Sequence, residues 1–353
     1  MLYNFEFVKN AGVYDVNIDV LDFFQKSISK SKYSAKIMSE NLRKVVEDSS
    51  TLEIKFKDVF KELNRNTIDK NVVYDFLKNN NNVLELLTNV AYPLLELKSP
   101  EYDDLFIKIK ELYLFIWNST LTTQTCASNY SSLNQHYFDH DTLNKNTRRV
   151  CPFCGLVKLD DPAEKRNEYD HYLDKSTYPY LSLNFNNLVP MCGKCNKRPN
   201  KGTQNIIFDS KGTRRIAYYP YNDVKPFEIS LNCKNIFMPN EKWILTTSSE
   251  KPDIGFKTWK TVFKIDSRYA NYIKSEFEFW LNQFTSYCEG SGALPETVSD
   301  FKNKVQSYLN DILIIFKNEL GYFLHLKFWN YLVGIPDSDL ELIINLMKER
   351  RDF

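Results

Sequence analysis

The sequence predicts an α+β protein that is mainly helical, with a small mixed module and a four-cysteine zinc knuckle between two helical regions. Three observations support this fold class. Apolar residues recur at helical spacing near both ends of the chain. Two C-x-x-C pairs lie in the middle, and short strand-like runs surround them. We therefore expect a helical region over residues 1–147, the mixed module over 148–240 and a second helical region over 241–353.

The first helical region is read from residues 20–125, where apolar side chains repeat every three to four positions. The asparagine run 79–82 predicts a turn between two helices. Residues 126–147 are polar and show no clear period, so we expect a linker or an exposed loop there. His136 and His140 could ligate a metal from one face of a helix, but we favour the polar linker.

The mixed module contains four strand-like runs, namely "EYDHYL" (168–173), "NLVPMC" (187–192), "NIIFD" (205–209) and "RRIAYY" (214–219). A helix is expected to begin after Cys195, with Asn196 in its first turn. Pro199 is tolerable in such a first turn, although it can shorten the helix. From about residue 255 the chain reads as helical again, and His325 is expected to be a core or interfacial histidine there.

The two cysteine pairs are Cys151 with Cys154 and Cys192 with Cys195. A two-residue gap lets both thiolates of a pair converge on one ion, and two such pairs can close a tetrahedral zinc site. Buried thiols without metal and a redox dithiol are the alternatives, although redox motifs normally use one pair. Zinc held by four thiolates has no open position for water, so it would stabilise the fold and perform no chemistry.

The 353 residues suffice for two or three domains, and 43% hydrophobic with 26% charged residues is typical of a soluble globular protein. The first twenty residues lack the pattern of a signal peptide, and no run of eighteen apolar residues occurs. We therefore expect a cytoplasmic protein with no membrane contact. The oligomeric state is left open by the sequence.

Positive charge is concentrated on the segment that holds the cysteines. Residues 141–215 contain fourteen lysine or arginine residues and eight aspartate or glutamate residues, a surplus of six positive charges in a chain whose net charge is +1. A local surplus of this size is compatible with an ordinary solvated surface, and also with a nucleic-acid phosphate backbone as partner.

Within this segment, Asp170-His171, Asn187, and Asn196 directly after the second cysteine pair resemble the motif of HNH nucleases, the ββα-metal or His-Me finger family. The flanking C-x-x-C pairs resemble the zinc-stapled branch of that family. The resemblance covers about residues 148–205, less than a fifth of the chain, and it is the combination of motifs that is specific.

The resemblance implies a role for each of these residues. His171 would be the general base that takes a proton from water. Asp170 and Asn196 would hold a divalent cation, Mg²⁺ or Mn²⁺, that stabilises the charge on the reacting phosphate. Asn187 would position the catalytic loop around His171. Adjacent strand residues point to opposite faces, so Asp170 and His171 share one site only if a bulge or a strand end re-aims one of them. Asp174 replaces a proline found in many relatives, which costs rigidity but no catalytic group.

The implied activity is hydrolysis of nucleic-acid phosphodiester bonds by a metal-dependent endonuclease. Double-stranded DNA is the favoured substrate, and RNA or single-stranded DNA stays open. The candidate phosphate contacts are Lys194, Lys197, Arg198, Lys201, Arg214 and Arg215. Tyr218, Tyr219 and Tyr221 could stack on bases, but we favour a core role for them.

Zinc-stapled HNH proteins of this general kind occur in bacterial defence, so the family analogy suggests a defence effector regulated by a protein partner. Two other functions are compatible with the residues. One is a zinc-stabilised module that binds nucleic acid without cutting it. The other is a protein-interaction scaffold built from the helical regions, in which zinc serves folding alone.

Overall fold

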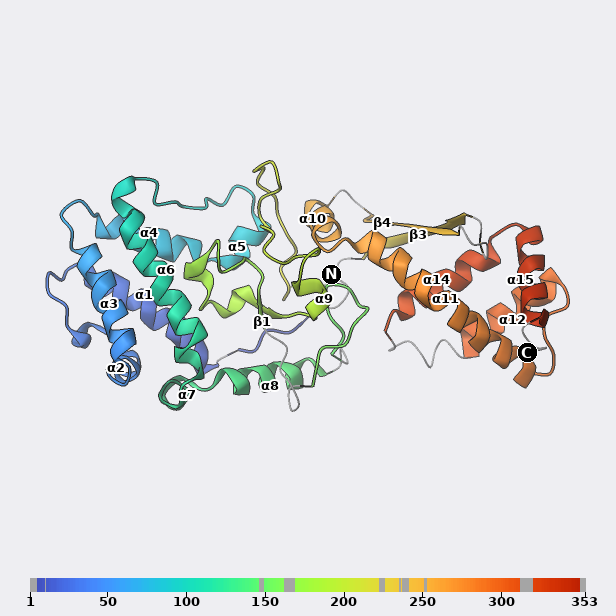
Figure 1. Cartoon of the computed structure of the whole chain (residues 1–353), viewed down its shortest axis with the longest axis horizontal. Helices are drawn as coiled ribbons and strands as arrows, with labels where there is room; N and C mark the ends of the chain where they lie inside the picture. The colour runs from blue at the N-terminus through green and yellow to red at the C-terminus, as the bar shows by residue number, and fades with distance from the viewer. Residues whose placement is uncertain are drawn as a thin grey trace. The chain divides into compact units, whose positions relative to one another are not determined.

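The computed structural model describes residues 5–9, 11–145, 149–161, 169–221, 226–234, 236, 241–250, 253–311 and 320–349. The structure is mainly helical and contains small antiparallel sheets, as the sequence predicts (Figure 1). It divides into two compact units, one comprising Met1–Phe153, Lys158–Val224 and Ile254–Thr258, the other Cys154–Val157, Lys225–Asp253 and Trp259–Phe353. Among the described helices, none is long and apolar enough to cross a membrane.

The first unit joins the N-terminal helices and the hairpin of the mixed module in one compact body. The expected boundary at residues 147–148 lies outside the described residues. The helices of this part are α1 (Asp15–Ser27), α2 (Glu40–Glu47), α3 (Ser50–Leu63), α4 (Lys70–Asn80), α5 (Val83–Thr88), α6 (Asp103–Asn118), α7 (Gln124–Tyr130) and α8 (Leu133–Leu143).

The core of this unit forms where α3 packs against α6 and α1 packs against α4. Phe23, Phe56 and Ile109 are fully buried there. Side-chain oxygens cap the N-termini of several helices. At the start of α3, Ser49 Oγ accepts a hydrogen bond from the N–H of Leu52, a donor that has no partner within the helix. α6 also packs against the 3₁₀ turn η6 (Pro179–Leu181), so the helical layer supports a loop of the mixed module.

The expectation of a linker over 126–147 is wrong, because the end of α7 and the whole of α8 lie there, and α8 buries both of its histidines. Tyr14 Oη donates to the carbonyl of Val8, so His136 Nε2 donates to Tyr14 over 2.6 Å. The other ring nitrogen, Nδ1, then accepts from Tyr169 Oη over 2.6 Å. These hydrogen bonds satisfy polar side chains inside the protein. The segment is therefore polar in sequence although it is buried.

Two short strands and one helical turn follow. β1 (Tyr169–His171) pairs antiparallel with β2 (Leu188–Pro190), and His171 lies opposite Leu188. Both strands agree with the strand-like runs of the sequence, although Glu168 lies outside the described residues. The expectation of a helix beginning after Cys195 is wrong: α9 (Gly193–Asn196) ends at Asn196. Lys197 is extended, and Pro199 has no N–H with which to continue a helix.

The two later strand-like runs do not become strands. They form an isolated bridge between Phe208 and Arg214. The tyrosines that follow serve packing, as favoured from the sequence: Tyr219 is buried, and its hydroxyl donates to Asn186 Oδ1 over 2.9 Å. Tyr221 donates to the carbonyl of Leu188, which ties this segment to β2.

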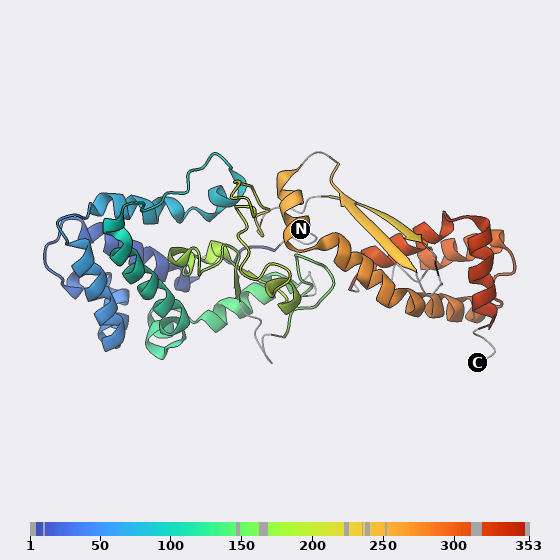
Figure 2. The same cartoon turned by 45° about the horizontal axis from the view of Figure 1, so that its top comes forward.

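The second unit contains an antiparallel pair and several helices. The elements are β3 (Glu228–Lys234), β4 (Lys242–Ser248), α11 (Ile265–Gly290), α12 (Val298–Asp311), α14 (Tyr322–Val333) and α15 (Asp337–Glu349). α10 (Ile254–Val262) lies between β4 and α11 in the chain, and its residues up to Thr258 belong to the first unit. β4 packs against α11, and β3 packs against α14 (Figure 2). The region from residue 241 on was expected to be helical, but it begins with the strand β4. His325 stacks on Trp280 at 4.5 Å between ring centroids, in the core as expected.

Candidate metal centre and active site

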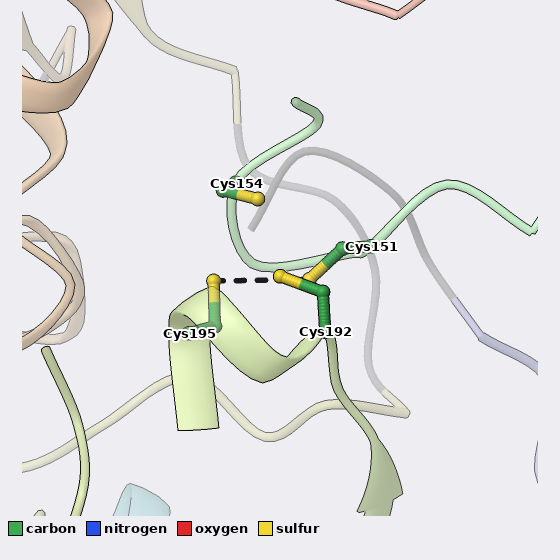
Figure 3. Close-up of side chains that lie close together, drawn as sticks. All are labelled: Cys151, Cys154, Cys192 and Cys195. Atoms are coloured by element: carbon green, nitrogen blue, oxygen red, sulfur yellow. Dashed lines mark hydrogen bonds between the residues drawn. The ribbon is translucent and has the colours of Figure 1, made fainter. Parts of the chain in front are cut away.

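Four cysteine thiols meet beside β2. Cys192 precedes α9 and Cys195 lies within it, while Cys151 and Cys154 come from the loop after α8. All four are buried, and their Sγ atoms lie within 4.8 Å of one another (Figure 3). Cys151 Sγ lies 3.8 Å from Cys195 Sγ. Two sulfurs bound tetrahedrally to one zinc ion at ~2.3 Å have this separation, and a disulfide is far shorter.

The local backbone explains why these cysteines converge. Gly155 has a φ of +66°, a conformation that side-chain-bearing residues rarely adopt, and it lets the chain turn directly after the first pair. In the second pair, the N–H of Cys195 donates to the carbonyl of Cys192 over 2.9 Å, which closes the turn. The expected four-cysteine cluster therefore forms, and its soft, buried donor set fits zinc.

The candidate zinc-binding turn, Cys192–Cys195, is joined to Asp170 through Lys201. The backbone N–H of Lys201 donates to the carbonyl of Cys195 over 3.1 Å. Its side-chain Nζ lies 2.8 Å from Asp170 Oδ2 and 3.0 Å from Oδ1, and it also donates to the carbonyl of His171 over 2.9 Å. Burial raises the pKa of Asp170 to about 6, while the Lys201 ammonium opposes the rise. One internal cation thus holds the carboxylate and the backbone of the candidate base.

His171 is fixed by a backbone carbonyl. Its Nε2 lies 3.0 Å from the oxygen of Ser182, which can only accept, so Nε2 carries the proton and Nδ1 keeps a lone pair. The edge of the ring meets Trp117, with the ring centroids 4.5 Å apart. Burial lowers the pKa of His171 to about 3. At neutral pH the imidazole is therefore uncharged and has one nitrogen able to accept a proton.

Asn187 closes the loop between the two strands. Its Oδ1 accepts from the N–H of Leu173 over 2.7 Å, and its Nδ2 donates to the carbonyl of the same residue over 2.9 Å. Its own carbonyl accepts from the N–H of Tyr172 over 2.8 Å. The residue is fully buried. It therefore fixes the backbone immediately after His171.

Asp174 supplies some of the rigidity that a proline would give at this position. Its Oδ2 accepts from the N–H groups of Ser176 and Thr177 over 3.1 and 3.2 Å. These bonds form a local turn, a common use of aspartate in loops. The turn leads into η6 and then to Ser182, whose carbonyl binds His171.

Asn196 is the last residue of α9, and its side chain is half-buried. Among the hydrogen bonds of the described residues, none joins this side chain to Asp170 or His171. The structure thus brings Asp170, His171, Asn187 and the zinc-binding turn together through bonds, whereas Asn196 is placed only by its position at the end of α9.

The candidate catalytic groups are covered in this structure. Asp170 and His171 are each 6% exposed. A cavity of about 630 Å³ opens on the far part of the same loop, beside Tyr178 and Tyr180, and neither Asp170 nor His171 lines it. The cavity therefore does not reach the candidate catalytic groups.

The basic residues fall into two groups. Lys194, Lys197 and Arg198 are exposed and can contact a phosphate backbone. Lys201 is 1% exposed and ion-paired, so it is removed from the expected phosphate contacts. Arg214 and Arg215 direct their guanidinium groups at backbone carbonyls, including those of Ile207 and Ile206, and serve the fold.

Sequence reasoning missed three contributors to the site. The ion pair of Lys201 had a partial signal, because Lys201 is one of the basic residues concentrated on the segment that holds the cysteines. The contact of Trp117 with His171 comes from α6, which is remote in sequence, and no pattern in the sequence indicated it. The carbonyl of Ser182 had no signal either, because every residue has a carbonyl.

Comparison with known proteins gives one partial similarity. The chain is 37% identical over 97 residues to Septu protein PtuB of Bacillus thuringiensis, a stretch that covers 27% of this chain and 35% of that protein. The chain thus matches about a third of the length of this curated relative. No family model and no solved structure matches the chain.

Proposed function

We propose that this protein is a metal-dependent HNH endonuclease that hydrolyses nucleic-acid phosphodiester bonds, with double-stranded DNA as the favoured substrate. The observation that carries the proposal is the state of His171, a neutral imidazole held in one tautomer by the Ser182 carbonyl, directly after the buried Asp170 in the chain. In this proposal β1, β2 and α9 constitute the ββα-metal module, and the four-cysteine zinc site stabilises it.

His171 is the general base. The Ser182 carbonyl holds Nε2–H, so Nδ1 is the atom that takes the proton from water. Asn187 fixes the backbone on the C-terminal side of this residue, and the Ser182 carbonyl fixes its ring. The base is thus held from two directions, which keeps its nitrogen in place while the water reacts with the phosphate.

Asp170 and Asn196 are the proposed protein ligands of the divalent cation, Mg²⁺ or Mn²⁺. The donor chemistry fits, because Asp170 is a buried hard oxygen donor that already requires a positive counter-charge. A cation bound there would neutralise charge on the reacting phosphate and on the leaving oxygen. Lys194, Lys197 and Arg198 supply exposed charges for the phosphate backbone.

A role in bacterial defence is part of the proposal. It is supported by the partial similarity to Septu protein PtuB, a defence-system protein. A regulatory protein partner, located with the nuclease in the cytoplasm, fits such a role. The helices of the two units offer surfaces for it, but no particular surface is assigned.

A zinc-stabilised module that binds nucleic acid without cutting it is the second candidate. The burial of Asp170 and His171 favours it, because each is only 6% exposed in this structure. This candidate predicts binding that weakens with salt and survives substitution of both residues.

Plasmid nicking separates the two functions. Wild type is incubated with supercoiled DNA in Mg²⁺, Mn²⁺ or EDTA, beside His171→Ala and the exposed-residue control Lys211→Ala. We expect nicking only with a divalent cation, a loss of ~10²–10⁴-fold in His171→Ala, and no change in the control. Equal cleavage by wild type and His171→Ala contradicts the proposal. Salt-sensitive binding without cleavage identifies the second candidate.

A further inference from the structure

Lys201 and Asp170 form an ion pair inside the first unit. The ammonium contacts both carboxylate oxygens, at 2.8 and 3.0 Å, and the two side chains are 1% and 7% exposed. The same Nζ donates to the carbonyl of His171 over 2.9 Å and to that of Gly202 over 3.4 Å. In this state the carboxylate is neutralised by a cation that belongs to the chain itself.

We propose that Lys201 is a displaceable counter-ion that controls the entry of a divalent cation to Asp170, an inference that rests on the proposed function. A hard cation takes carboxylate oxygens, and the Lys201 ammonium donates to Oδ1 of Asp170 and lies 2.8 Å from Oδ2, which has no hydrogen-bond partner among the described residues. An ammonium and a divalent cation on one desolvated carboxylate repel each other strongly, because water does not screen them. Metal binding therefore requires Lys201 to leave Asp170.

Movement of Lys201 away from Asp170 requires a change in its side chain alone. Lys201 lies in the loop after α9, where Gly202 has a φ of +47° and the preceding residues Lys197 and Arg198 are exposed. Its backbone is anchored by the bond from its N–H to the Cys195 carbonyl, so a side-chain rotation moves the ammonium while the zinc-binding turn stays in place. A lysine side chain has the rotatable bonds for such a change.

A permanent structural ion pair makes the opposite prediction. If Lys201 served to orient Asp170 for the metal, removing it would weaken metal binding. If it is a competing counter-ion, removing it leaves a buried carboxylate that needs a cation, and metal binding tightens. The sign of the change in metal affinity therefore decides between the two roles.

The test is the affinity for Mn²⁺ in the absence of nucleic acid, measured by electron paramagnetic resonance on the zinc-loaded full chain. We expect Lys201→Met to bind Mn²⁺ about tenfold more tightly than wild type, or more. The double variant Asp170→Asn/Lys201→Met should lose this gain. Lys211→Met, which removes an exposed charge outside the site, should match wild type. Unchanged or weaker binding by Lys201→Met overturns the proposal.

A measurement on the wild-type protein tests the same proposal even if Lys201→Met does not fold. In protein labelled with ¹⁵N-lysine, the buried Lys201 ammonium should give a slowly exchanging signal that disappears or shifts on addition of Mg²⁺. A signal that is unchanged at saturating Mg²⁺ overturns the proposal. Neither readout depends on cleavage, so failure of the nicking experiment and failure of this inference are distinguishable.

Discussion

The Nε2 atom of His171 donates a hydrogen bond of 3.0 Å to the carbonyl oxygen of Ser182, eleven residues further along the loop between β1 and β2. Ser182 directly follows η6, which packs against α6. The tautomer of the candidate base is therefore set by the path of the loop backbone, and that path depends on the helical layer of the first unit. This dependence explains why residues outside the motif should control the site.

Substitution of Asn187 by alanine should destabilise the fold. We expect a loss of about 2–4 kcal/mol in the free energy of unfolding, because the buried N–H and C=O of Leu173 lose their partner. Urea unfolding of the zinc-loaded protein measures the change. As a control, Asn66→Ala changes an exposed asparagine whose side chain makes none of the hydrogen bonds identified among the described residues, and it should cost less than about 1 kcal/mol. Similar losses in the two variants contradict the assigned role of Asn187.

The cysteine cluster should bind zinc stoichiometrically. Cys195→Ser removes one of four thiolates and should lower both the zinc content and the melting temperature, because structural zinc contributes directly to folding. Cys233→Ser, outside the cluster, should keep the zinc of wild type. Elemental analysis of purified protein gives the answer. Equal zinc in the two variants, or none in wild type, would show that the cluster is a set of buried thiols.

Replacement of Trp117 by alanine should uncover His171. Burial holds the pKa of this imidazole near 3, so the wild-type residue stays neutral from pH 8 down to pH 5. Loss of the indole admits water, and we expect the pKa to rise toward ~6.5, so the ring gains its proton within that range. His136, His140 and His325, whose pKa values burial also lowers, serve as internal controls in the same NMR titration.

A His171 resonance that stays constant from pH 8 to pH 5 in Trp117→Ala would contradict this prediction. Titration of all four histidines would indicate general loosening of the fold instead of local exposure. Zinc content and circular dichroism, measured on the same sample, separate that outcome from the expected one.

The exposed cations after the second cysteine pair should set the salt dependence of DNA binding. Neutralising three phosphate contacts should reduce the slope of log K against log salt by about 2–3, since each contact contributes about 0.9. The variant combines Lys194→Ala, Lys197→Ala and Arg198→Ala. The matched control removes three exposed lysines of other helices, Lys26, Lys44 and Lys57. Equal slopes in the two variants contradict a phosphate contact at this segment.

Spacing in the chain predicted the parts of the site that depend on short stretches. Two C-x-x-C pairs suffice to bring four thiols together, and β1 and β2 coincide with strand-like runs. Local chemistry also explains the failures. The segment that reads as a polar linker is α8, because His136 is satisfied inside by Tyr14 and Tyr169. Polarity in the sequence cannot distinguish a solvated residue from a buried one with partners.

Other features could not be read from the sequence because they arise from tertiary contacts. Lys201 reads as one basic residue among several, and only the fold buries its ammonium against Asp170. α9 is short because Lys197, directly after it, is extended. Helix and strand propensities do not predict this conformation of Lys197 from the sequence. The surroundings of His171 depend on α6, which is remote in sequence.

The most direct test of the account is a crystal of the full chain, soaked in Mn²⁺ together with a short DNA duplex and measured for anomalous scattering. The account predicts a manganese peak in contact with the oxygens of Asp170 and Asn196, with His171 Nδ1 facing a water beside the bound phosphate. The ammonium group of Lys201 should no longer contact the Asp170 carboxylate. A manganese ion bound elsewhere, or DNA seated away from β1 and α9, would contradict it.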